Sequence, residues 1–92
     1  MISRSVKVAN RLGLHARAAA RFVHMASRFQ SHVKVSRGSQ TMDGKSIMGI
    51  LLLAAAAGTV LTVSTDGEDE QAALDALCGF IETGFGEDTC SA

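Results

Sequence analysis

His15 is the residue whose position in this sequence best suits it for chemistry. It lies within residues 10–20, where a strand-like run gives way to an alanine-rich helical pattern, and Gly13 lets the chain bend just before it. The first N–H groups of a helix have no partners within the helix and carry partial positive charge, so such a helix start attracts anions. Arg17, in the expected first turn, adds a planar guanidinium that suits phosphate oxygens.

The chemistry that this arrangement permits is phosphoryl transfer. A positive helix end disfavours the imidazolium form, so the His15 ring should stay neutral and keep a lone pair that can attack phosphorus. The N–H groups of Ala16 and Arg17, together with the Arg17 guanidinium, would then neutralise the charge of the bound group. The alternative interpretation is an ordinary loop histidine beside a solvated arginine, because single polar residues are common where helices begin.

The length and composition indicate one small domain with an aliphatic core. We expect the domain to span residues 1–92, with a flexible tail at about residues 88–92, because 92 residues suffice for one modest core. The chain contains four Phe but no Trp or Tyr, so aliphatic side chains must fill that core. Cys78 falls on a helical apolar face and Cys90 in the tail. We therefore expect both cysteines to be reduced thiols in a cytoplasmic protein, and no signal peptide is visible.

The charged residues are distributed very unevenly. All nine Lys and Arg residues lie in residues 1–46 with a single acid, and the other eight acids follow, so the two halves carry formal charges of +8 and −8. A basic half can indicate nucleic-acid binding, but these basic residues are spread singly and the chain lacks Tyr and Trp for base stacking. We therefore expect an acidic protein partner and no nucleic acid. One basic stripe at helical spacing starts beside His15 and is either a solvated face or a docking surface: Arg17, Arg21, His24 and Arg28.

Alternating and helical patterns predict the order β-α-β-β-α-β-α. We expect strands at residues 2–8, 32–37, 40–42 and 59–65, and helices at residues 16–29, 46–57 and 69–83. The apolar residues of the first helix follow helical spacing, namely Ala16, Ala19, Ala20, Phe22, Val23, Ala26 and Phe29. Gly58 is expected to cap the second helix. Residues 47–63 carry no charge, but their periodicity changes at Gly58, which favours a buried helix and a strand over a membrane span. The fold class is α+β, with helices covering one face of a four-stranded antiparallel sheet.

The start of the second expected helix is another candidate site. Ser46 is an N-cap, and a phosphate on its hydroxyl would be stabilised by the positive helix end. Four large apolar residues follow on a short helix and cannot all face inward: Ile47, Met48, Leu51 and Leu52. We expect one or two of them to form an exposed apolar patch that binds partners.

Two other motifs carry no site. The run Gly44-Lys45-Ser46 resembles the end of a nucleotide-binding loop, but five residues instead of four separate it from Gly38. His24 and His32 lack a Cys or acidic neighbour at ligand spacing, so we expect no metal site.

Three groups of residues at matching spacing resemble the HPr family, the histidine-containing phosphocarriers of the bacterial phosphotransferase system. They are residues 13–18 (GLHARA), residues 45–51 (KSIMGIL), and Asp66-Gly67 with the ending at residues 85–87. The resemblance covers residues 2–88 and implies an open-faced β-sandwich. It also implies that enzyme I phosphorylates His15 on Nδ1, with phosphoenolpyruvate upstream, and that an enzyme IIA receives the group. No cofactor is expected.

The resemblance also implies roles for other residues. Arg17 matches the arginine that stabilises the phosphate. Ser46 matches the serine that HPr kinase/phosphorylase modifies in some bacteria. That modification weakens phosphoryl transfer through His15. The apolar docking surface is matched by four residues: Ala20, Ile47, Met48 and Leu51.

Two alternatives stay open. Ala18 stands where many sugar-system members have proline, and residues 53–58 (LAAAAG) are similar to the nitrogen-related branch, so the sequence is compatible with either branch. The protein could instead be a non-catalytic regulatory module that binds through the Ile47/Met48 patch and is switched at Ser46. We expect a monomer, because no feature of the sequence argues for self-association.

Overall fold

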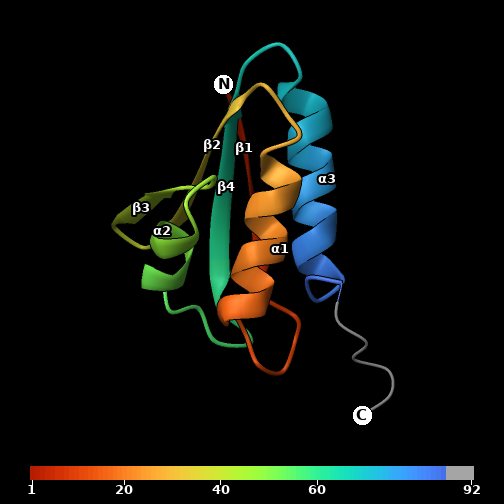
Figure 1. The fold of residues 1–92 in the computed structure, drawn as a ribbon. Helices are drawn as coiled ribbons and strands as arrows, with labels where there is room; N and C mark the ends of the chain where they lie inside the picture. The colour runs from red at the N-terminus through yellow and green to blue at the C-terminus, as the bar shows by residue number, and fades with distance from the viewer. Residues whose placement is uncertain (87–92) are drawn as a thin grey trace.

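Seven elements follow one another along residues 1–86, the part of the chain that the computed structural model describes (Figure 1). They are β1 (Ile2–Lys7), α1 (Ala16–Ala26), β2 (His32–Arg37), β3 (Gln40–Asp43), α2 (Ile47–Leu52), β4 (Val60–Asp66) and α3 (Glu70–Glu82). The predicted order and the predicted α+β fold class are both confirmed. The expected tail at residues 88–92, with Cys90, lies outside the described residues.

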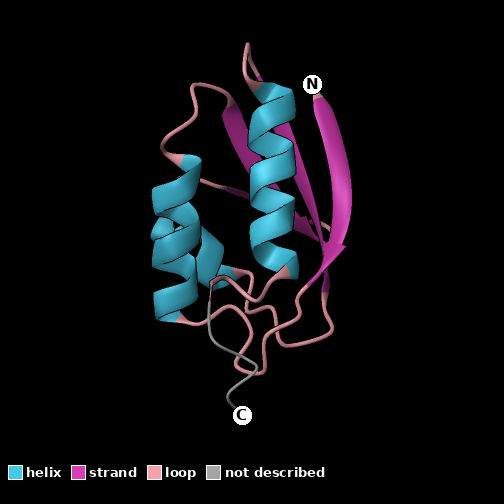
Figure 2. Cartoon of the chain, turned by 90° about the vertical axis from the view of Figure 1, so that its right-hand side faces the viewer, coloured by secondary structure: helices cyan, strands magenta, loops and turns pink. Residues whose placement is uncertain are grey.

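The four strands form one antiparallel sheet in the order β1-β4-β2-β3. The helices lie on one side of this sheet, and the other side has no helix over it in the described part of the chain (Figure 2). Alternation within each strand produces this asymmetry: Val33 and Val35 of β2 are buried, whereas Lys34 between them is exposed. Hydroxyl pairs lie on the uncovered side, such as Ser36 and Thr41, whose oxygens are 3.0 Å apart.

Helix α1 buries some of the apolar residues that follow helical spacing, among them Ala19, Phe22 and Ala26, and exposes others. Ala18, Ala19, Phe22 and Ala26 are its buried residues, whereas Ala16 and Ala20 are exposed. The Phe22 ring accounts for this orientation, because its large apolar area outweighs that of any alanine. The helix also ends at Ala26, before the expected residue 29, since the N–H groups of Arg28 and Phe29 bond to carbonyls only three residues back and form a tighter turn.

Helix α2 is shorter than predicted. It ends at Leu52, and Gly58 does not cap it, so the expectation of a helix to residue 57 is wrong. The chain turns at Ala54, whose φ is +49°, and residues 53–58 form a segment that we call the alanine loop. Tertiary contacts override the helix propensity of alanine here, because Leu53 and Ala55 are buried and Gly58 N–H donates to Val8 O, 2.8 Å away.

Helix α3 buries the face that the spacing predicts, namely Leu74, Leu77, Cys78 and Ile81, with Ala73. Burial raises the pKa of the Cys78 thiol, as expected for an inert core cysteine.

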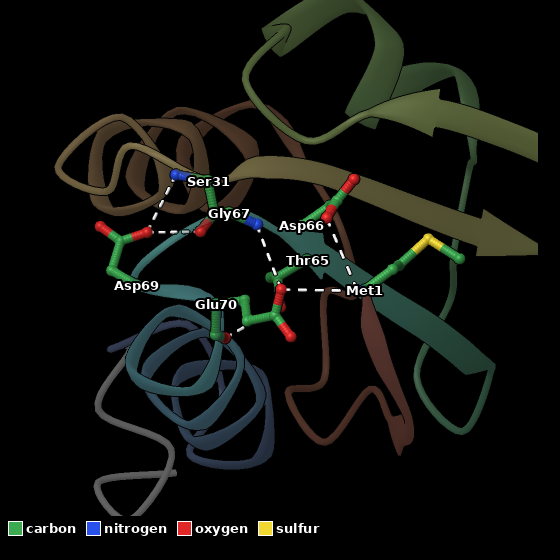
Figure 3. A network of polar contacts seen from close by, with 7 residues as sticks. All are labelled: Met1, Ser31, Thr65, Asp66, Gly67, Asp69 and Glu70. Carbon is green, nitrogen blue, oxygen red and sulfur yellow. Dashed lines mark hydrogen bonds and ion pairs between the residues drawn. The ribbon is translucent and has the colours of Figure 1, made fainter.

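A polar network ties the start of α3 to the loop after α1, at the end of the sheet opposite to the start of α1 (Figures 1 and 3). Asp69 precedes α3 but makes no capping bond to it. Its carboxylate instead accepts hydrogen bonds from the Ser31 hydroxyl and from the N–H groups of Gln30 (2.8 Å) and Ser31 (2.9 Å). These bonds, above all the one from the Ser31 hydroxyl and then that from Gln30, hold the pKa of Asp69 below its usual value. The Met1 ammonium lies 3.5 Å from carboxylate oxygens of Asp66 and Glu70.

Candidate functional site

His15 immediately precedes α1, as predicted, and its side chain also caps the N-terminus of the helix. Its backbone is extended (φ −88°, ψ 179°), and its ring Nδ1 accepts a hydrogen bond from the Arg17 N–H at 3.2 Å. A ring nitrogen that accepts an N–H bond carries a lone pair, so the neutral ring with its proton on Nε2 fits this geometry. The ring is partly exposed. The structure therefore presents a nucleophilic nitrogen at the positive end of a helix.

The loop before the helix, residues 10–15, is tied to itself by hydrogen bonds, and we call it the His15 loop. Asn10 is 1% exposed, and its Nδ2 donates to Gly13 O at 2.7 Å. The Gly13 N–H donates to Asn10 O (3.2 Å), and the His15 N–H donates to Gly13 O (3.1 Å). Sequence reasoning assigned no role to Asn10, although an asparagine before a turn glycine is a recognisable signal.

The His15 loop also rests on the alanine loop; both lie at the lower end of the molecule in Figure 1. The Leu14 N–H donates to Ala55 O at 2.8 Å. Gly13 has a φ of +67°, and a methyl group at its Cα would lie 2.5 Å from Ala55 O and 2.9 Å from Ala56 Cα. Only glycine fits this position, because both its backbone conformation and the close approach exclude a side chain.

Ala16 and Arg17 are the first two residues of α1, and both are exposed. Arg17 contacts the His15 ring through its backbone N–H. The sequence predicts that this N–H binds a transferred phosphoryl group, but it does not predict the bond to the ring. The Arg17 guanidinium starts the predicted stripe, whose members Arg21, His24 and Arg28 are also exposed. Ala20 lies at the edge of an open groove of about 450 Å³, between the stripe and Phe80.

Ser46 caps α2, with its Oγ accepting a hydrogen bond from the Gly49 N–H at 3.1 Å. Ile47 is 44% exposed and Met48 is 67% exposed, as an exposed patch on this helix requires. Leu52 is 59% exposed, whereas Leu51 is partly buried against the core. The apolar patch on α2 therefore consists of Ile47, Met48 and Leu52, and α2 packs alongside α1, the helix that His15 caps.

Neither a cluster of metal ligands nor a membrane-spanning helix occurs in residues 1–86. Within that range, no group of three or more His, Cys, Asp or Glu side chains is placed to hold a metal ion. None of the helices there is both long and apolar enough to cross a bilayer.

Comparisons with known proteins agree with one another. The sequence model of a family described as "PTS HPr component phosphorylation site" matches residues 2–83. The phosphocarrier protein HPr of Cupriavidus necator is 49% identical over 87 residues, which cover 95% of this chain and 98% of that protein.

Among solved structures, HPr-C-His from Thermoanaerobacter tengcongensis has a TM-score of 0.90 at 42% identity, covering 96% of this chain and 99% of that one. A structure described as an HPr dimer from the same organism has a TM-score of 0.75 at 42% identity, covering 95% and 100%.

Proposed function

Because this chain belongs to the HPr family, the phosphocarrier proteins of the phosphotransferase system, we propose that His15 is the residue that carries the phosphoryl group. The observation that carries this assignment is the hydrogen bond from the Arg17 N–H to His15 Nδ1, at 3.2 Å. In this bond the Nδ1 lone pair points to the N-terminus of α1, where the Arg17 N–H is already placed to bind negative charge. A family member of this kind passes on a phosphoryl group and is not itself an enzyme.

The proposed step is a simple exchange of bonds at phosphorus. The Nδ1 lone pair of His15 forms a bond to phosphorus, and the bond from phosphorus to the donor atom breaks with its electron pair staying on the donor. The Arg17 N–H, which loses Nδ1 as acceptor, then donates to a phosphoryl oxygen. The Ala16 N–H and the Arg17 guanidinium complete the neutralisation of the transferred group.

The proposed partners follow from the family. Phosphorylated enzyme I, charged from phosphoenolpyruvate, is the donor and an enzyme IIA is the acceptor. The Ile47/Met48 patch and Ala20, with the half-buried Leu51, form the proposed docking surface. An exposed apolar patch on α2, a helix that packs against α1, supports this proposal. We propose that the protein acts as a monomer, although one solved HPr is described as a dimer.

A regulatory role is the second candidate, and the exposed patch beside Ser46 favours it. A phosphate on the Ser46 hydroxyl would replace the bond that Oγ now accepts from Gly49 N–H and would put negative charge next to the docking surface. In that case an HPr kinase/phosphorylase would weaken partner binding without touching His15.

Intact-mass analysis tests the proposal. The protein is mixed with phosphoenolpyruvate and a bacterial enzyme I, and the His24→Ala variant, which loses a histidine of the same helix, is the matched control. We expect one acid-labile phosphoryl group on the parent and on His24→Ala, and none on His15→Ala. Comparing sugar-type with nitrogen-type enzyme I assigns the branch. If neither enzyme produces an adduct, the proposal is contradicted and the regulatory role becomes the favoured function.

A further inference from the structure

We propose that Arg37, the last residue of β2, is a positioning residue for the His15 loop; this inference rests on the proposed function of His15. Arg37 belongs neither to the His15 loop nor to the docking surface. Its side chain instead acts through the alanine loop, on which the His15 loop rests.

One guanidinium nitrogen of Arg37 holds two neighbouring carbonyls. Its Nη1 donates to Leu53 O at 2.6 Å and to Ala54 O at 3.1 Å. These two carbonyls belong to the peptide groups on either side of Ala54. A single side chain therefore restrains both backbone dihedrals of that residue.

Ala54 needs such a restraint. Its φ of +49° lies in the left-handed region that residues with a side chain rarely adopt, and the surrounding structure must maintain it. The Leu53 carbonyl belongs to the C-cap of α2, a position whose carbonyl has no partner within the helix, and a cation is favoured at this end of a helix. Arg37 thus sets the direction in which the chain leaves α2.

The contacts continue from Ala54 to His15. The next residue, Ala55, accepts the Leu14 N–H at 2.8 Å, and the Gly13 backbone lies against Ala55 and Ala56. Leu14 is bonded directly to His15 along the chain. A change in the path of the alanine loop at Ala54 therefore displaces the acceptor that holds the residue before His15.

Loss of the Arg37 contacts should impair transfer more than docking. Phosphoryl transfer requires the attacking nitrogen to be held close to phosphorus and in line with it, and a displacement of about 1 Å can cost up to about a hundredfold in rate. Of the proposed docking residues on α2, the exposed Ile47 and Met48 lie at the opposite end of the helix from the alanine loop, and only the half-buried Leu51 lies near it, so the KM for phosphorylated enzyme I should change little.

The experiment compares Arg37→Ala with Arg37→Lys and with Lys34→Ala, which removes an exposed positive charge from the same strand. Two quantities are measured: hydrogen exchange of the Leu14 amide in the unphosphorylated protein, and kcat and KM for phosphoryl acceptance from enzyme I charged by phosphoenolpyruvate. We expect Arg37→Ala to exchange the Leu14 amide about tenfold faster and to lower kcat about tenfold at an unchanged KM. Arg37→Lys, whose ammonium group has three donors, should recover most of both losses, and Lys34→Ala should match the parent.

Other results of this experiment would overturn the proposed role of Arg37 or separate it from the proposed function of His15. Parent values of both quantities in Arg37→Ala overturn the proposal, and so does a rise in KM alone, which would assign Arg37 to docking. If Arg37→Ala does not fold, Arg37→Gln takes its place in the same comparison. If the parent accepts no phosphoryl group, the proposed function fails, whereas the Leu14 exchange still decides whether Arg37 holds the loop.

Discussion

Replacing Gly13 by alanine adds one methyl group at the point where the His15 loop meets the alanine loop. Two separate penalties follow. The φ of +67° strains any residue with a side chain, and the new methyl group would lie 2.5 Å from Ala55 O and 2.9 Å from Ala56 Cα, both backbone atoms. Because a backbone cannot move aside as a flexible side chain does, the two loops must separate.

Gly38 provides a matched control for the first penalty. It has a similar φ of +59°, but a methyl group there would meet nothing within 4 Å. Gly38→Ala should therefore cost only the left-handed strain, about 1–2 kcal/mol. Gly13→Ala should cost that amount plus about 1–3 kcal/mol for forcing atoms into an already packed contact.

Urea unfolding followed by circular dichroism measures both costs. We expect Gly13→Ala to be about 2 kcal/mol less stable than Gly38→Ala. In thermal unfolding the same difference should lower the Tm of Gly13→Ala by about 8–16 °C relative to Gly38→Ala. Phosphoryl acceptance should also slow in Gly13→Ala and stay at the parent rate in Gly38→Ala. Equal losses of stability in the two variants would refute the packing of the His15 loop on the alanine loop.

Three further predictions concern other parts of the molecule. Arg17→Ala keeps the backbone N–H that reaches His15, so it should slow phosphoryl acceptance at least about tenfold while changing stability by less than about 0.5 kcal/mol; acceptance at the parent rate would disprove the role of the guanidinium. The lowered pKa of Asp69 means that its carboxylate stabilises the fold above the usual value of 3.8 and that this stabilisation is lost as the pH falls through the lowered pKa. Asp69→Asn should therefore be less stable than the parent at neutral pH, and urea unfolding should show the gap closing in acid; a gap independent of pH would contradict this. Met48→Asp, at a 67% exposed position, should raise the KM for enzyme I about tenfold without loss of stability, and an unchanged KM would remove Met48 from the docking surface.

Elements with a strong local pattern could be predicted from the sequence. The strands alternate clearly, and the spacing of Leu74, Leu77 and Cys78 marks the buried face of α3, since large apolar side chains leave little choice of orientation. The position of His15 at the start of a helix was predictable, because a loop with a glycine runs directly into a helical pattern. These features depend on neighbours in the chain.

What the sequence could not predict depends on contacts between distant segments. Nothing in an alanine run indicates that the chain turns at Ala54, and the side chain that bonds to the carbonyls on both sides of this turn, Arg37, comes from the distant strand β2. The spacing of apolar residues in α1 does not separate the buried alanines from the exposed ones, because all alanines have the same hydrophobicity and their burial depends on the packing of the helix against the sheet. The site shows the same limit, since a sequence displays the guanidinium of Arg17 but not the direction of its backbone N–H.

The assignment of the phosphoryl group to Nδ1 of His15 is the central claim, and NMR of the ring nitrogens tests it most directly. The protein, labelled with ¹⁵N at its three histidines, is phosphorylated by enzyme I and phosphoenolpyruvate, and coupling to phosphorus is sought at each ring nitrogen. We predict coupling at Nδ1 of His15 and at no other nitrogen. Coupling at Nε2 of His15, or at either nitrogen of His24 or His32, would contradict the account.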